Sequence, residues 1–308
     1  MSFTRTKDRI WVVYDVVAAW LARRSMPVRK IGYGVFGVVM YAAYLFPGSS
    51  VKATFAALAA AAGNVAPFAL FRRYVKGFLR GMNRIEQVRH GYTDAIDAML
   101  EIPEKDRLDA LLSKGGVVMA IPHAHASLVM GRGLGRHYPL LALVRSTANE
   151  RRAKSEWEIY ENLGCDFVDI RLESPTKVAR KVLAVLNKGG LVVGTVDRIR
   201  EAPPADAPIN SAADIVRAEA FGEPIGITGW PARFTAKAGA VIVPSMIVQS
   251  ESGISLRLGN AVTPGDDLVE STQDWVNELE RLFRTYPDEW TFALDKHWSR
   301  VLRQSAQD

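Results

Sequence analysis

The stretch "GGVVMAIPHAHASL", residues 115–128, decides the fold. Its central residues, VVMAI, are all apolar and follow a pair of glycines, which is typical of a strand that is buried on both faces. Such a strand needs helices on each side of its sheet, so the stretch predicts an α/β domain. Two histidines, His123 and His125, follow directly where this strand is expected to end.

The same pattern recurs further along the chain. Short apolar runs bounded by turn residues predict more strands in LLALVRS, CDFVDIR, GGLVVGTVDR, AVIVPSMIV and GISLRLG. Helices are expected between them, at residues 149–164, 174–188, 229–238 and 270–285. We therefore predict a three-layer α/β/α domain with a mainly parallel mixed sheet over residues 96–308.

The ends of these strands carry the candidate site residues. Sites in open α/β sheets form beyond the carboxyl ends of the strands. His123, Arg145 and Asp197 each follow such an end, so the sequence predicts that they share one edge of the sheet. The segment 199–220, rich in proline and alanine, is expected to form a surface loop or a short helix over these ends.

Residues 1–95 have a different, apolar and basic character. Two uncharged runs, 31–51 and 53–71, approach the roughly 20 residues that a membrane span needs. A Pro-Gly-Ser-Ser sequence breaks the first run, and a glycine, an asparagine and a proline interrupt the second. They predict a membrane-associated helical hairpin or a helix pair that caps the domain, with a spanning helix as the remaining alternative.

The segment "RRYVKGFLRGMNRIEQVR", residues 72–89, distributes six cations among apolar residues at helical spacing. This pattern predicts a basic amphipathic helix, which suits an anionic membrane surface. The alternative is an ordinary solvated face that packs on the domain. The six cations are Arg72, Arg73, Lys76, Arg80, Arg84 and Arg89.

Composition narrows the classes of partner. The net charge of +6 and the pI near 9.4 favour anionic partners. No zinc-ligand spacing, recognition-helix pattern or aromatic ribonucleoprotein motif accompanies the charge, so no nucleic-acid partner is expected. Cys165 is the only cysteine, which excludes an internal disulfide and a cysteine-only metal site.

The order and spacing of several motifs resemble a known family. "VVMAIPH" delivers His123, "LALVRS" ends in Arg145, "YENLG" closes a helix, and "GGLVVGTVDR" leads to Asp197 and Arg198. "FGEPIGITGWPARF" and then "YPDEW" follow, and the pattern ends at Trp298. From about residue 109 to residue 298 the chain resembles the bacterial late acyltransferases of lipid A biosynthesis and the related phosphatidylinositol mannoside acyltransferases, a branch of the lysophospholipid acyltransferase superfamily.

The resemblance implies transfer of an acyl chain from a thioester donor, acyl-CoA or acyl carrier protein, to a hydroxyl or amine of a membrane lipid or glycolipid. It implies work at the cytoplasmic face of the inner membrane, with the protein peripheral or anchored by the hairpin, and no cofactor or metal. His123 would be the general base and Asp197 the supporting acid. Arg145 and Arg198 would bind an anionic substrate group. His125 and Ser127 would add hydrogen-bonding contacts to the substrate.

The sequence departs from the family at one decisive position. The family has a carboxylate five positions after its histidine, and here Leu128 stands there for His123 and Met130 for His125. Three explanations remain open. The acid comes from elsewhere, with Asp197 as the best candidate; or the chain is a catalytically inactive protein that binds lipid or acyl donor; or the two histidines bind a metal ion.

Overall fold

A seven-stranded sheet organises the molecule, and the computed structural model describes residues 3–63, 65–206 and 214–306. The sheet order is β1-β9-β8-β2-β5-β3-β4, and β8–β9 is its antiparallel pair. This confirms the prediction of a mainly parallel mixed sheet in an α/β fold. The strands are β1 (Leu100–Glu101), β2 (Val117–Ile121), β3 (Leu140–Val144), β4 (Asp166–Asp169), β5 (Leu191–Thr195), β6 (Ile215–Ala220), β7 (Glu223–Thr228), β8 (Val241–Gln249) and β9 (Ile254–Leu258).

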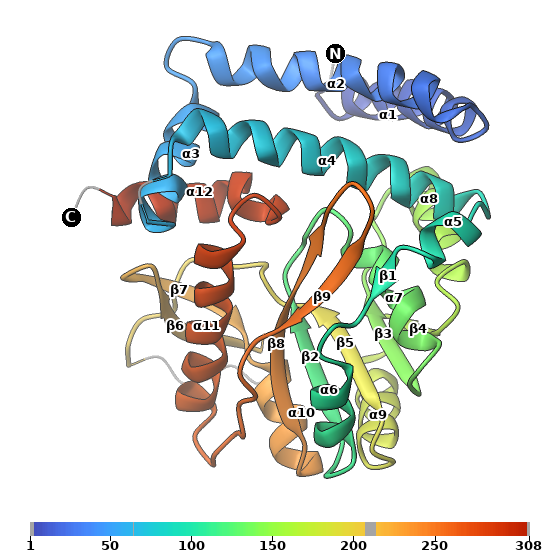
Figure 1. The fold of residues 1–308 in the computed structure, drawn as a ribbon. Helices are drawn as coiled ribbons and strands as arrows, with labels where there is room; N and C mark the ends of the chain where they lie inside the picture. The colour runs from blue at the N-terminus through green and yellow to red at the C-terminus, as the bar shows by residue number, and fades with distance from the viewer. Residues whose placement is uncertain (1–2, 64, 207–213, 307–308) are drawn as a thin grey trace.

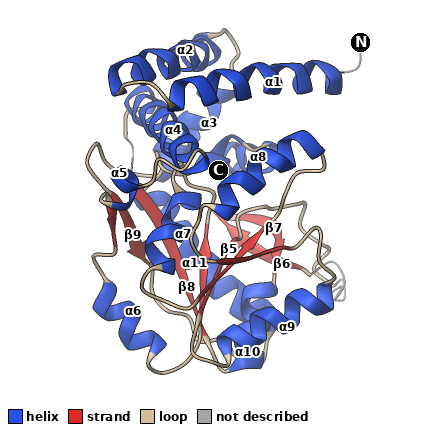
Figure 2. Ribbon diagram, turned by 90° about the vertical axis from the view of Figure 1, so that its right-hand side faces the viewer, coloured by secondary structure: helices blue, strands red, loops and turns tan. Residues whose placement is uncertain are grey.

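Helices lie on both faces of this sheet (Figure 2). On one face, the α9 side chain Val182 and the α10 side chain Phe234 pack with Val118 and Val192 of the sheet. The other face meets the larger core, which includes Val129 of α7 and Trp275 of α11. The helices are α1 (Phe3–Ala22), α2 (Met26–Leu45), α3 (Ser50–Ala61), α4 (Pro67–Arg89), α5 (Asp94–Asp97), α6 (Lys105–Leu112), α7 (Ser127–Gly135), α8 (Glu150–Glu161), α9 (Pro175–Leu186), α10 (Trp230–Ala238), α11 (Leu268–Thr285), η1 (Thr291–Leu294) and α12 (Lys296–Ser305).

The N-terminal helices form a separate layer above the sheet. Figure 1 shows α1 and α2 side by side, with α4 between them and the strands. Within the described residues, α2 and α3 together have the length and apolar character of a membrane span, but a bend of 85° separates them and neither helix suffices alone. The second uncharged run, 53–71, covers most of α3 and the start of α4.

The basic segment 72–89 lies in α4, as predicted, but it is not a surface helix along its whole length. Arg84 and Arg89 are buried, and Arg89 forms ion pairs with Asp15 of α1 and Glu158 of α8. Only the first half of α4 exposes its cations. The prediction of a basic amphipathic helix holds only for the first half of α4. Further along, Arg89 binds carboxylates on other helices, and Arg84 donates to the side chain of Gln249 and to the carbonyl of Ser250, contacts that helical periodicity does not reveal.

The loop or short helix predicted for residues 199–220 is wrong in its last part. Residues 215–220 form β6, which pairs antiparallel with β7, and the burial of alternate residues in β6 explains the strand. Phe221 and Gly222 make the turn with φ of 54° and 78°, and the backbone N–H of Phe221 donates to Glu280. The part of that prediction that falls on residues 207–213 lies outside the described residues.

Candidate active site

His123 and Asp197 come together because their strands are neighbours. β2 and β5 pair in parallel with Ile121 opposite Thr195, so the residues two positions beyond each strand end also face each other. The distance between His123 Nδ1 and Asp197 Oδ1 is 2.5 Å. The sequence prediction that these two residues meet at one edge of the sheet is confirmed.

Asp197 is fully buried, and its carboxylate has three donors. Oδ2 accepts the backbone N–H of His123 at 3.0 Å and the indole N–H of Trp290 at 2.9 Å, while Oδ1 faces the imidazole. An ionised carboxylate can only accept, so His123 Nδ1 carries the proton of this contact, and in the neutral ring Nε2 then has the lone pair. The His123 side chain is 25% exposed, whereas the Asp197 side chain is fully buried. The imidazole is therefore accessible from solvent while the carboxylate that orients it is not.

The segment between α11 and α12 supplies further contacts to His123. The backbone N–H and the hydroxyl of Thr291 both donate to the carbonyl of His123, at 2.8 and 2.5 Å. The Phe292 ring stacks on the imidazole with a centroid distance of 3.9 Å. The sequence assigned no role in the site to Trp290, Thr291 or Phe292, and only the "YPDEW" motif, which ends at Trp290, pointed to this region.

Arg198 and Arg145 lie at the same edge of the sheet. Arg198 is exposed, and its guanidinium carbon lies 5.6 Å from the centroid of the Phe292 ring that also contacts His123. Arg145 is exposed directly after β3, the strand next to β5. Within the described part of the chain, neither arginine has a carboxylate at salt-bridge distance, so both charges are available to an anionic ligand.

The backbone after Arg145 is held by two acids. The N–H of Thr147 donates to Glu156 at 2.7 Å, and the N–H of Ser146 contacts both carboxylate oxygens of Asp169. Burial raises the pKa of the Glu156 carboxyl above its ordinary value, and the nearby Arg198 opposes that shift. These contacts fix the loop that presents Arg145.

His125 lies away from the imidazole of His123, against α4. Its ring meets Tyr74 and Phe78 edge-on, and its Nε2 donates to the carbonyl of Asp288 at 2.9 Å. The chain passes so close that a Cβ at Gly81 would come 2.4 Å from the His125 carbonyl oxygen. Burial lowers the pKa of His125 to about 4, so this histidine is neutral and braces the segment that carries Trp290.

Ser127 closes the turn that leads from β2 into α7. Its hydroxyl accepts the backbone N–H of Ala124 at 2.7 Å and lies 3.0 Å from the carbonyls of Pro122 and Ala124. The side chain is almost fully buried in these contacts. The structure therefore gives Ser127 backbone partners at the turn after β2.

Leu128, five positions after His123, has apolar surroundings. Leu128 packs against the cluster formed by Ala142, Val144 and Ile159. Across the described ranges, no group of three or more His, Cys, Asp and Glu side chains is arranged to hold a metal ion.

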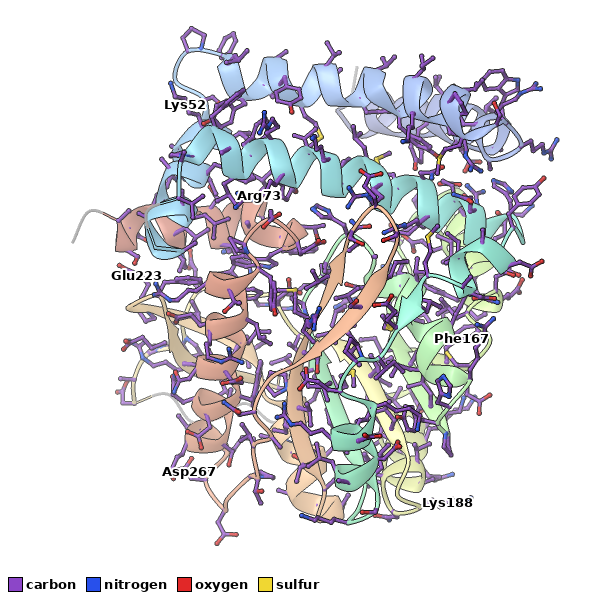
Figure 3. The ribbon with its side chains drawn as sticks, in the orientation of Figure 1. Lys52, Arg73, Phe167, Lys188, Glu223 and Asp267 are labelled. Carbon is purple, nitrogen blue, oxygen red and sulfur yellow. The ribbon has the colours of Figure 1, made fainter. Side chains whose placement is uncertain are left out.

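A cavity of about 470 Å³ lies at the amino ends of β3 and β4, the end of the sheet away from His123. Lys188, just after α9, also marks that end, whereas Arg73 of α4 lies at the other end and pairs with Asp288 (Figure 3). The cavity is lined by Gly135, Tyr138, Pro139, Leu140, Glu161, Gly164, Cys165 and Asp166. Burial raises the pKa of the Cys165 thiol to about 11, which suits an unreactive side chain.

Comparison with known proteins found no relative of this chain. The sequence matches no protein-family model, and a search of curated proteins gives no match either.

Proposed function

We propose that the protein transfers an acyl chain from a thioester donor, acyl-CoA or acyl carrier protein, to a hydroxyl or amine of a membrane lipid or glycolipid. The observation that carries the proposal is the 2.5 Å contact between His123 and the buried Asp197. This carboxylate takes the place of the acid that the family has at the position of Leu128. A histidine oriented by a carboxylate and open to substrate on its other nitrogen is the arrangement that general-base acyl transfer needs.

In the proposed reaction, His123 acts as the general base. His123 Nε2 removes the proton of the acceptor hydroxyl while the oxygen attacks the thioester carbonyl and forms a tetrahedral intermediate. Collapse of the intermediate breaks the C–S bond, and the departing thiolate takes the proton back from Nε2. Asp197 keeps Nδ1 protonated throughout and stabilises the imidazolium that forms between the two steps.

Two arginines with no carboxylate partner among the described residues support an anionic substrate. Arg198 lies beside Phe292, and Arg145 directly follows β3, the strand next to β5, so we expect an anion bound between them to lie near His123. A guanidinium binds phosphate with two parallel hydrogen bonds, and both coenzyme A and a phospholipid or glycolipid acceptor carry phosphate.

The α1–α2 pair supports a membrane location. The outward side chains of each helix recur at helical spacing and form one apolar face, which is far larger than isolated exposed apolar residues on a soluble protein. We infer that this face rests on the cytoplasmic surface of the inner membrane, with anionic lipids near the exposed Arg23 and Lys30. The exposed apolar residues are Val13, Val16, Val17, Trp20, Met26, Val28, Ile31, Val35, Val38, Val39, Leu45 and, just after α2, Phe46.

Product formation tests the proposal directly. Full-length protein is incubated with anionic lipid vesicles that contain candidate acceptors, together with acyl-CoA or acyl carrier protein, and acylated lipid is detected by mass spectrometry. We expect turnover by the native protein, none by His123→Ala, and an unchanged rate for His137→Ala, which removes an exposed histidine outside the site. A rate that His123→Ala leaves intact would eliminate this mechanism.

An inactive lipid- or donor-binding protein is the second candidate, and the observation that favours it is the apolar packing of Leu128 where the family has its acid. It predicts that the native protein binds acyl-CoA but forms no product, and that binding survives His123→Ala. Parallel measurement of acyl-CoA binding by calorimetry separates the two candidates.

A further inference from the structure

Two fully buried tryptophans donate to the same residue in different ways. The indole N–H of Trp290 donates to the Asp197 carboxylate at 2.9 Å, whereas the indole N–H of Trp298 donates to the Asp197 backbone carbonyl at 2.6 Å. Both side chains lie in the core, and their rings meet edge-on with centroids 4.9 Å apart. Only the first contact reaches the group that orients His123.

We propose that Trp290 is the positioning residue that fixes the Asp197 carboxylate, and through it the His123 ring, in the orientation that the proposed acyl transfer requires. This inference rests on the proposed function for its kinetic consequence, but not for its structural one. The Asp197 carboxylate reaches His123 from a neighbouring strand, so it needs support from outside the His123 segment. Trp290 provides that support from the segment between α11 and α12.

The Trp290 ring has little freedom to move. It stacks on Phe283 with a centroid distance of 3.7 Å, and its backbone forms a bridge with Ala124, next to His123. On the preceding side, the His125 backbone N–H donates to the carbonyl of Glu289. The indole N–H of Trp290 is therefore held in place before the bond forms, so little conformational entropy is lost when the Asp197 carboxylate accepts it.

Loss of the Trp290 indole N–H would leave the Asp197 carboxylate less firmly oriented. Oδ2 would keep the backbone N–H of His123 as its remaining donor, and the smaller ring in Trp290→Phe leaves space for the carboxylate to rotate. Oδ1 then no longer holds His123 Nδ1 in one position. The neutral ring would divide between its two tautomers, and the form protonated on Nε2 cannot accept a proton from the acceptor.

The kinetic test compares two matched variants. Trp290→Phe should lower kcat about tenfold, because a bond to a charged acceptor is lost, and should leave KM unchanged because no substrate contact is removed. Trp298→Phe removes an equally buried indole N–H from the same residue, but from its backbone carbonyl. It should lower stability without this selective loss of kcat.

A second measurement does not depend on activity. In full-length protein labelled with ¹⁵N-histidine, the nitrogen shifts of neutral His123 should show the Nδ1-protonated tautomer in the native chain and in Trp298→Phe. Trp290→Phe should show a mixture of tautomers. If the folded Trp290→Phe variant keeps the native tautomer, the inference is overturned; if the tautomer shifts while the native protein forms no acylated product, the positioning role stands and the proposed function fails.

A reciprocal experiment covers the case in which Trp290→Phe does not fold. Asp197→Asn removes the charge at the acceptor while leaving the backbone carbonyl in place. The proton resonance of the Trp290 indole N–H should then move upfield, whereas that of Trp298 should stay where it is. Equal behaviour of the two indole protons would contradict the assignment.

Discussion

Asp197 holds both the ring and the backbone of His123, because Oδ1 faces Nδ1 at 2.5 Å and Oδ2 accepts the backbone N–H at 3.0 Å. A carboxylate within the same turn as its histidine can orient the ring, but a carboxylate on the next strand must also keep the two strand ends together. The double contact does both. It gives His123 one fixed nitrogen, although a leucine and not an acid stands at position 128.

The first prediction concerns Asp197 as the acid that orients His123. Asp197→Asn should lower the rate of acyl transfer by about ten-thousandfold, as loss of the orienting acid does in other histidine-dependent sites. Adding Leu128→Asp should not restore it, because Leu128 packs among apolar side chains. Leu128→Asp alone should lower the free energy of unfolding by about 2 kcal/mol.

Leu172→Asp is the control, since Leu172 is 64% exposed and should tolerate the change. Chemical unfolding of Leu128→Asp and Leu172→Asp measures the loss of stability. Product assays on Asp197→Asn, alone and combined with Leu128→Asp, measure the loss of activity. Recovery of activity in the double variant would show that position 128 can still reach the imidazole.

The second prediction concerns Glu289, which is buried next to Trp290. Burial raises the pKa of Glu289 to about 7 from an ordinary 4.5, so its contribution to stability is full below pH 4.5 and is lost as the pH rises through 7. The loss should reach about 3 kcal/mol. Glu289→Gln keeps the shape and removes the ionisation, so the variant should become more stable relative to the native chain as the pH rises from 5 to 8.

Denaturant unfolding followed by tryptophan fluorescence at both pH values measures this difference. Glu161→Gln changes an exposed carboxyl and serves as the control. If native protein and Glu289→Gln lose the same stability between the two pH values, the buried acid is not responsible.

The sequence predicted the edge of the sheet at which the site lies, because continuous apolar runs mark buried parallel strands and sites follow their carboxyl ends. His123 and Asp197 could be paired for that reason alone. The role of Trp290 could not be predicted, because it depends on a contact with a residue 93 positions away. No local pattern in the sequence distinguishes a tryptophan that donates to a carboxylate from one that only fills the core.

The structure differs from the sequence prediction at His125 and Arg89 as well, and in both cases the cause is a contact with residues far away in the sequence. His125 lies two residues after His123, but the chain turns between them, so the alternation of a strand no longer applies and the ring packs against Tyr74. Arg89 is buried because Asp15 and Glu158 surround it, and both belong to other helices. Charge and periodicity indicate a helix but not which of its charges find partners.

The third prediction concerns Arg198. Arg198→Gln should raise the KM for the phosphate-bearing substrate about tenfold and leave kcat nearly unchanged, because in the proposed reaction the guanidinium binds the substrate and takes no part in proton transfer. The effect should weaken as salt is added. Steady-state kinetics with acyl-CoA as the varied substrate, and then with the lipid acceptor as the varied substrate, identifies which of the two carries the anion.

Arg180→Gln removes an exposed arginine on α9 and should change neither KM. A KM that stays at the native value for both substrates in Arg198→Gln would show that this arginine does not bind an anion in the reaction.

The fourth prediction concerns the apolar face of α1 and α2. Ile31 and Val38 lie two turns apart on α2 and are 73% and 68% exposed, so both would lie in lipid if this face rests on a bilayer. Changing both to aspartate should weaken membrane partitioning by about a hundredfold or more, since each side chain contributes on the order of 1.5 kcal/mol when buried.

Vesicle flotation of the native chain and the double variant measures partitioning, and washes with high salt or with carbonate distinguish electrostatic attachment from insertion of the apolar face. Val269→Asp is the control, because Val269 is 39% exposed on α11, outside the α1–α2 pair. Salt alone should not release the native protein, since side chains buried in lipid are not screened by ions. If the native chain remains with the soluble fraction in the absence of detergent, the apolar face has another partner and the proposed lipid acceptor loses its route to the site.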